Sequence, residues 1–207
     1  MTRVLLLHAY PFDASMWDAQ REALAAHEVV APRLYDLPGE TVEDWAEALE
    51  PELGAGAVVG GASMGGYVAL TLARLAPERV AGLVLAGAKA TRDTPERLAG
   101  REETLAQLAR GVLPELTVPI TAEELARATR LLRDRPDQTD VMRALAAPLL
   151  VCVGTEDDIL RVDEATELAA AAPHGRLEVF AGAGHLLSLD QPERFADVLV
   201  DFLARCR

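Results

Sequence analysis

Short apolar runs rich in Val and Leu alternate along the chain with longer amphipathic stretches, which predicts strands separated by helices. This alternation is typical of an α/β fold, in which a mostly parallel sheet is covered by helices on both faces. Six strands are expected, at Val4 to His8, Val29 to Ala31, Ala57 to Gly60, Val80 to Ala86, Leu149 to Val153 and Leu177 to Phe180. Helices are expected between and after them, near Ser15 to His27, Val42 to Glu50, Met64 to Ala76, Asp163 to Ala172 and Pro192 to Arg205.

The segment from Thr91 to Ala147 departs from this pattern. It contains no convincing strand but several polar helical patterns, at Glu102 to Arg110, Ala122 to Arg133 and Gln138 to Ala146. We therefore expect residues 1–90 and 148–207 to form the core, with 91–147 as a helical insertion between two strands. The arginines of the insertion lie at helical spacing, which favours a solvated face over a binding site for an anionic substrate.

Length and charge narrow the function classes. The 207 residues correspond to one domain, and 20 Lys plus Arg against 33 Asp plus Glu give a formal charge of -13. Because nucleic acids and anionic membranes are bound mainly through basic side chains, we expect neither as a partner. The two cysteines form no CxxC pair, and no apolar run resembles a signal peptide or a membrane span, so we expect a cytoplasmic protein.

The most informative motif is Gly61-Ala62-Ser63-Met64-Gly65, in which an apolar strand runs through a Gly-x-Ser-x-Gly turn into a helix. This is the nucleophile elbow in its usual context. The sharp turn strains the serine backbone and projects its hydroxyl away from the sheet, so small residues are needed two positions to either side. The amides at the start of the following helix can stabilise negative charge on a substrate carbonyl oxygen. Ser63 is therefore the candidate nucleophile.

A serine nucleophile needs a base, and the base needs a carboxylate that orients it. One strand ends in Gly154-Thr155-Glu156-Asp157-Asp158, and the next strand is followed by Ala181-Gly182-Ala183-Gly184-His185. Both loops follow parallel strands, so they lie at the sheet edge where Ser63 is expected. His185 is the candidate base. Any of the three acids would serve by position, and we favour Asp157 over Glu156 and Asp158.

These motifs together resemble the alpha/beta-hydrolase superfamily, in particular its esterase, enol-lactonase and cofactor-free haloperoxidase-like branch. The matching segments are His8-Ala9-Tyr10-Pro11-Phe12, Met16-Trp17, Gly61 to Gly65, Gly154-x-x-Asp157, Gly182 to Leu186 and Gln191-Pro192-Glu193. The resemblance implies a Ser63, Asp157 and His185 triad, with backbone amides of Tyr10 and Met64 as the oxyanion hole. It also implies that His8 is structural, holding the oxyanion loop. In that family the insertion 91–147 is a cap, and here it is compact.

Two departures from the family pattern stand out. Ala9 replaces the usual glycine after the histidine, and the chain starts at the family's third strand, as if trimmed of the N-terminal hairpin. The strand near Val29 is then expected at a sheet edge, where its shortness limits aggregation.

The resemblance implies a serine hydrolase that cleaves a small carboxylic ester or lactone and needs no cofactor or metal. Thioester hydrolysis, perhydrolysis or haloperoxidase chemistry, and C-C bond cleavage can use the same triad and stay open at this point. A noncatalytic ligand-binding protein on the same scaffold is the alternative from another class, and the complete triad argues against it. The oligomeric state is not predicted by any motif.

Overall fold

The computed structural model describes residues 1–206, and its centre is a six-stranded sheet in the order β2-β1-β3-β4-β5-β6. Every neighbouring pair of strands is parallel. The strands are β1 (Arg3–Leu7), β2 (Glu28–Val30), β3 (Ala57–Ala62), β4 (Val80–Ala86), β5 (Leu149–Gly154) and β6 (Gly175–Phe180). All six strands expected from the sequence are present, and β2 lies at a sheet edge as predicted.

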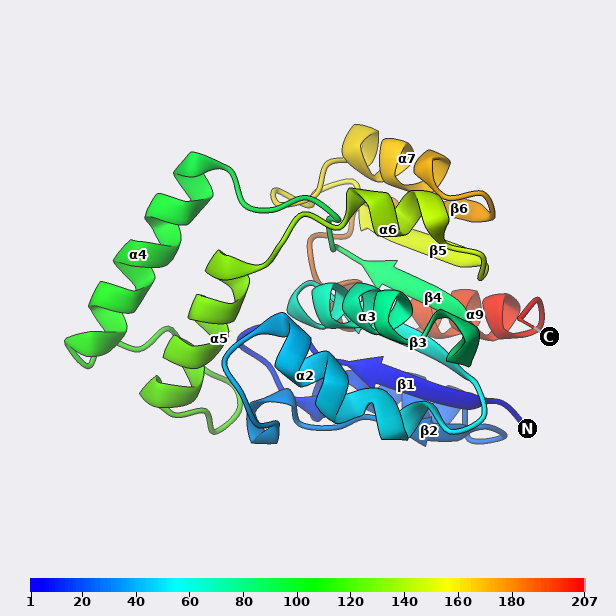
Figure 1. Ribbon diagram of the computed structural model, residues 1–207, viewed down its shortest axis with the longest axis horizontal. Coiled ribbons are helices and arrows are strands. Elements are labelled where there is room, and N and C mark those ends of the chain that lie inside the picture. The colour runs from blue at the N-terminus through cyan, green and yellow to red at the C-terminus, as the bar shows by residue number, and fades with distance from the viewer. Residues whose placement is uncertain (207) are drawn as a thin grey trace.

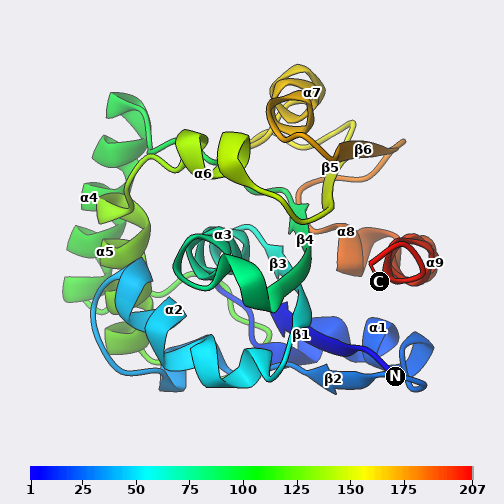
Figure 2. The ribbon, with the colours of Figure 1, turned by 45° about the vertical axis from the view of Figure 1, so that its right-hand side comes forward.

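Helices cover both faces of the sheet, as the fold class predicts (Figures 1 and 2). One face carries α2 (Val42–Leu49), α3 (Met64–Leu75) and α7 (Val162–Ala171), and the other carries α1 (Asp18–Ala23), α8 (Leu187–Asp190) and α9 (Pro192–Leu203). Alternate side chains of the strands enter the two cores. In β1, Leu5 and Leu7 belong to the α3 side, whereas Val4 and Leu6 belong to the α9 side.

Local sequence signals explain several helix ends. Thr41 and Asp44 form a capping box at the start of α2, and Pro192 occupies the first turn of α9. The helix expected near Ser15 to His27 is shorter than predicted. A 3-10 turn at Ala14–Trp17 precedes α1, which ends at Ala23 because the chain must turn back before β2 pairs with β1.

Three helices lie between β4 and β5: α4 (Pro95–Ala109), α5 (Ala122–Asp134) and α6 (Thr139–Ala144). Figure 1 shows α4 and α5 beyond the carboxyl ends of the strands, whereas α6 lies beside α3 and α7. The α5 helix is fastened to the loop after β2, where Glu124 pairs with Arg33 at 2.7 Å and Arg127 donates to the carbonyls of residues 35, 37 and 39. By contrast, α4 buries one residue, Leu108. Within residues 1–206, no helix has the length and apolar character needed to cross a membrane.

Candidate active site

Ser63 stands between β3 and α3, at the carboxyl end of the sheet. Its backbone angles are φ 46° and ψ -110°, and within residues 1–206 it is the one non-glycine residue with a positive φ. A side chain in this region of φ and ψ is strained and is kept there by its surroundings. The Ser63 amide donates to the Ala86 carbonyl at 2.8 Å, and the Ser63 carbonyl accepts from the Gly66 amide at 2.9 Å. The turn thus has the strained geometry that the motif predicts.

The glycines of the elbow are required by close backbone contacts. A Cβ atom on Gly65 would lie 2.1 Å from the Leu7 carbonyl oxygen at the end of β1. On Gly61 it would lie 2.3 Å from the backbone of Gly65. Since real Cβ atoms essentially never come so near to backbone atoms, larger residues would push α3 away from the sheet. The small residues thus position the amino end of α3 directly over β1.

His185 and Asp157 meet across two loops that follow neighbouring strands. The His185 Nδ1 atom lies 2.9 Å from Oδ2 and 3.0 Å from Oδ1 of Asp157. The loops are joined by further bonds: the Glu156 amide donates to the Ala183 carbonyl at 2.9 Å, and the Gly182 amide donates to the Thr155 hydroxyl at 2.8 Å. These bonds hold the loops after β5 and β6 together, and so they keep Asp157 and His185 within hydrogen-bonding distance.

Of the three acids considered from the sequence, Asp157 is the one that contacts His185. Its side chain is 1 % exposed, whereas Glu156 and Asp158 are exposed residues. Burial by itself would raise the pKa of the Asp157 carboxyl. Hydrogen bonds from His185 and from the Leu160 amide outweigh burial, and the pKa lies below its ordinary value. Asp157 is therefore an ionised acceptor for the proton on Nδ1 of His185.

The other ring nitrogen of His185, Nε2, is buried and has no hydrogen-bond partner among residues 1–206. His185 lines a cavity of about 270 Å³ together with Ser63 and Tyr10. A neutral imidazole with its proton on Nδ1 presents a lone pair on Nε2. The unpartnered Nε2 is thus a proton acceptor beside the same cavity as the serine hydroxyl.

His8 has a different role from His185. It is fully buried at the end of β1, and its Nε2 accepts the Leu34 amide at 2.8 Å. Its Nδ1 consequently carries the proton and donates to the Ala9 carbonyl at 3.0 Å. Burial lowers the pKa of His8 to about 4. His8 is therefore a neutral structural residue that ties the loop after β1 to residue 34.

The two amides expected to form an oxyanion hole lie on the loop after β1 and at the first residue of α3. The structure gives neither the Tyr10 nor the Met64 amide an acceptor among residues 1–206. Tyr10 lines the cavity. Its loop begins at the carboxyl end of β1, and Gly65 packs against that end of the strand. Neither amide has an acceptor within the described residues, and Tyr10 and Ser63 line the same cavity.

The wall of the cavity opposite the strands comes from α4. Its residues Arg97, Gly100, Arg101 and Thr104 line the cavity, at the i, i+3, i+4 and i+7 spacing of one helix face. The sequence interpretation of the insertion's arginines as a solvated face is therefore wrong for Arg97 and Arg101. Because a helical pattern shows which residues share a face but not what that face meets, only the packing of α4 reveals this.

Two further residues of the site were not singled out from the sequence for this role. Tyr67 lines the cavity while remaining 4 % exposed. Gly87, directly after β4, has φ 61°, and a Cβ on it would lie 2.9 Å from Cε1 of His185. A glycine at the carboxyl end of a strand is a signal for close approach, but only the fold shows that His185 approaches it. In the described part of the chain, residues 1–206, no group of three or more His, Cys, Asp or Glu side chains could hold a metal ion.

Comparison with known proteins shows the family of the chain. Residues 4–198 match the family described as "Alpha/beta hydrolase family". The pimeloyl-[acyl-carrier protein] methyl ester esterase of Aromatoleum aromaticum is 29% identical, and the match covers 96% of each chain. The structure of a thermophilic esterase from Thermogutta terrifontis, determined with malate bound, is 31% identical with a TM-score of 0.91 and covers 100% of this chain and 90% of that one.

The enol-lactonase from Burkholderia xenovorans LB400 shares the fold. It is 23% identical with a TM-score of 0.78, and the match covers 98% of this chain and 91% of that one. The chain belongs to the alpha/beta hydrolase family and is an enzyme of its esterase-like group.

Proposed function

We propose that this protein is a serine hydrolase that cleaves small carboxylic esters or lactones through an acyl-enzyme. The observation that carries the proposal is the environment of His185: its Nδ1 is bound to Asp157, and its Nε2 has no partner in the described part of the chain and lies beside the cavity lined by Ser63. This is the arrangement that a base needs to accept a proton from a serine hydroxyl. The names of the esterase relatives agree with an ester substrate.

In the first half-reaction the Ser63 oxygen attacks the ester carbonyl carbon and its proton moves to Nε2 of His185. The amides of Tyr10 and Met64 donate to the carbonyl oxygen as it becomes negative, and each contributes about 3 kcal/mol to stabilising the transition state. The C-O bond to the alcohol then breaks, and His185 returns the proton to the leaving oxygen. Asp157 stays ionised throughout and stabilises the imidazolium.

In the second half-reaction water attacks the acyl-enzyme and gives its proton to His185. The bond to Ser63 breaks, the serine recovers its proton, and the carboxylic acid leaves. With a lactone, the alcohol remains part of the same molecule and the product is a hydroxy acid. No step requires a cofactor.

The size of the cavity supports a small substrate. Its volume of about 270 Å³ is below the range of about 300–1,000 Å³ typical of sites for drug-sized ligands. Helices of the segment 91–147 lie beyond the strand ends and limit this space. We therefore infer that the segment 91–147 acts as a cap on a catalytic core formed by 1–90 and 148–207. This limit favours short acyl and alcohol groups.

A fluorophosphonate probe tests the nucleophile directly. We expect the probe to label Ser63 in the wild type and to label nothing in Ser63→Ala, which also loses hydrolysis of p-nitrophenyl acetate. Ser15→Ala serves as the matched control, because Ser15 is an exposed residue in the 3-10 turn before α1. Full activity in Ser63→Ala, or an unlabelled wild type, contradicts the proposal.

The same triad supports thioesterase, perhydrolase, haloperoxidase and C-C hydrolase reactions in other proteins of this fold. A panel separates them: p-nitrophenyl acetate, an acyl thioester, an enol-lactone, a C-C cleavage substrate, and peracid formation from acetate and peroxide. We expect the oxygen esters or the lactone to give the highest kcat/KM. A higher kcat/KM for another substrate would move the assignment to that reaction while leaving Ser63 as the nucleophile.

A further inference from the structure

We propose that the preferred substrates carry a free carboxylate in addition to the scissile ester, and that Arg97 of α4 binds this carboxylate, with Arg101 beside it. The chemical class is the monoester of a short dicarboxylic acid. This inference rests on the proposed ester hydrolysis and specifies the substrate class of the same site. The observation behind it is an uncompensated positive charge on the cavity wall.

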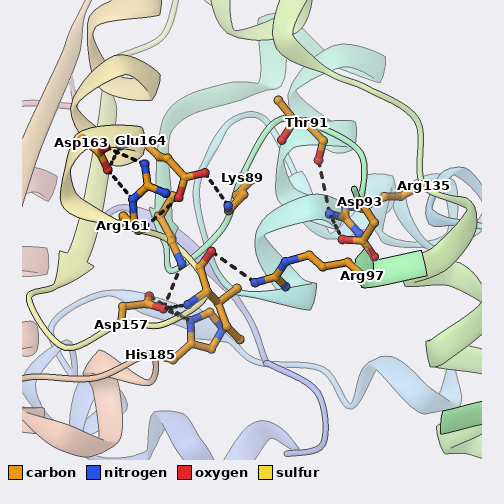
Figure 3. A network of polar contacts seen from close by, with 12 residues as sticks. Lys89, Thr91, Asp93, Arg97, Arg135, Asp157, Arg161, Asp163, Glu164 and His185 are labelled. Atoms are coloured by element: carbon orange, nitrogen blue, oxygen red, sulfur yellow. Dashed lines mark hydrogen bonds and ion pairs between the residues drawn. The ribbon is translucent and has the colours of Figure 1, made fainter. Parts of the chain in front are cut away.

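Arg97 is half-buried and forms no ion pair with any carboxylate among residues 1–206. Its Nη2 donates to the Ile159 carbonyl at 3.4 Å, a long contact to the loop that also carries Asp157. Figure 3 shows the Arg97 side chain reaching from the α4 side toward that loop, close to His185 and Asp157. A guanidinium has five donors, so Arg97 retains most of its hydrogen-bonding capacity for a ligand.

Arg101 is paired, but its partner is shared. Its Nε donates to Oδ2 of Asp93 at 3.1 Å, while Oδ1 of the same carboxylate accepts from the buried Arg135 at 2.7 Å. The Arg135 guanidinium also lies 4.1 Å from the centre of the Tyr67 ring, behind the cavity wall. One carboxylate therefore balances two guanidinium groups, and with Arg97 this side of the site has a net charge of +2.

The carboxylate of Asp157 lowers this net charge to +1 but does not cancel it. Asp157 does not line the cavity, and among residues 1–206 the ionisable residues that do are Arg97, Arg101, His185 and two tyrosines. The chain as a whole carries -13, so positive charge at this one wall is not the effect of a basic surface. An anion inside the cavity would be stabilised, although the protein repels anions at long range.

A second cavity, of about 300 Å³, differs from the Ser63 cavity in how its positive charge is paired. It lies between α6 and α7, and its Lys89 pairs with Glu164 at 2.7 Å, with Glu167 also on the wall. Positive charge there has a carboxylate partner within the protein. At the Ser63 cavity Arg97 has no carboxylate partner within residues 1–206, and a substrate carboxylate would fill that position.

Gly100 lies beside open space on this part of α4. It occupies the interior of a helix, where glycine is less favourable than alanine by about 1 kcal/mol. A Cβ atom built on it would meet nothing within 4 Å, so no packing contact requires the glycine. It lines the cavity together with Arg97 and Arg101.

The test compares monomethyl glutarate, which is an anion, with neutral dimethyl glutarate. For Arg97→Gln we expect kcat/KM for the monoester to fall about 10- to 100-fold, the range of a charged hydrogen bond, with less than about a twofold change for the diester. Arg97→Lys should retain part of the preference, because it keeps the charge but not the planar fork. The matched control is Arg110→Gln, which removes the same charge from the exposed end of α4 outside the cavity. It should leave kcat/KM unchanged for both substrates.

Two results would overturn the inference while leaving the hydrolase assignment in place. One is a wild type that hydrolyses both esters without preferring the anion. The other is an Arg97→Gln variant that loses activity equally on both, which would indicate a structural role for Arg97. Thermal melting of each variant shows whether the fold is kept.

Failure of the proposed function itself has a different signature: no hydrolysis of either ester and no fluorophosphonate labelling. Calorimetric binding of glutarate then still decides the anion site. At least tenfold weaker binding to Arg97→Gln than to the wild type and to Arg110→Gln supports a carboxylate site, and equal binding to all three rejects it.

Discussion

Replacing Asp157 by asparagine tests how the carboxylate controls the proton on His185. Oδ1 of Asp157 accepts amide hydrogens from Ile159 at 2.7 Å and Leu160 at 3.0 Å. In Asp157→Asn these two donors would keep the amide oxygen at that position. The new NH₂ group would then occupy the Oδ2 position, 2.9 Å from Nδ1 of His185.

An NH₂ group can only donate, so it favours an Nδ1 that accepts and a histidine proton on Nε2, while the amide oxygen 3.0 Å from Nδ1 is the one acceptor left for the original tautomer. A protonated Nε2 cannot take a proton from Ser63. In serine proteases the same wrong tautomer lowers kcat by about 10⁴-fold. We expect a similar fall in kcat/KM, equivalent to about 5 kcal/mol, with little change in stability because the backbone contacts of the side chain persist.

The assay is steady-state hydrolysis of p-nitrophenyl acetate, together with the rate of fluorophosphonate labelling, because both need the base on His185. Asp158→Asn is the control: its side chain is an exposed neighbour of the same charge, and activity should stay near that of the wild type. An Asp157→Asn enzyme within about tenfold of the wild type would refute the reasoning. So would a large loss in Asp158→Asn alone.

Three further predictions concern the scaffold of the site. Gly65→Ala places a Cβ 2.1 Å from a β1 carbonyl oxygen, so we expect a loss of about 3 kcal/mol or more in urea unfolding and loss of esterase activity. Asp93→Ala leaves Arg135, whose side chain is 2 % exposed, without its carboxylate partner, and should lower the free energy of unfolding by about 3–5 kcal/mol. Glu102→Ala removes an exposed ion pair and should lower it by less than about 1 kcal/mol. The pKa of His8 is 6.5 in the unfolded chain and about 4 in the folded protein, so between these pH values only the unfolded chain binds the proton. The free energy of unfolding should therefore fall by up to about 3 kcal/mol as pH drops from 6.5 to 4. His8→Asn should flatten this dependence on pH, and an unchanged slope in His8→Asn would contradict the reasoning.

The order of elements follows from patterns that are local in the chain. Each of the six strands is an apolar run bounded by turn residues, and the boundaries agree with the structure to within two residues. The elbow is equally local, because Gly61 and Gly65 are required by the turn that positions Ser63. The cytoplasmic location expected from the two cysteines has no counterpart in the structure and stays a prediction.

What the sequence by itself determined is therefore the α/β architecture and the three residue types proposed for the chemistry, because periodicity, turn residues and motif spacing act over a few neighbouring positions. Which of three adjacent acids reaches His185 was decided by the pairing of β5 with β6, which buries Asp157 and leaves Asp158 exposed. The role of Arg97 was decided by the placement of α4 over the strand ends, since the same helical pattern could equally have faced solvent. Contacts between segments far apart in the chain depend on packing, and packing is a property of the whole fold.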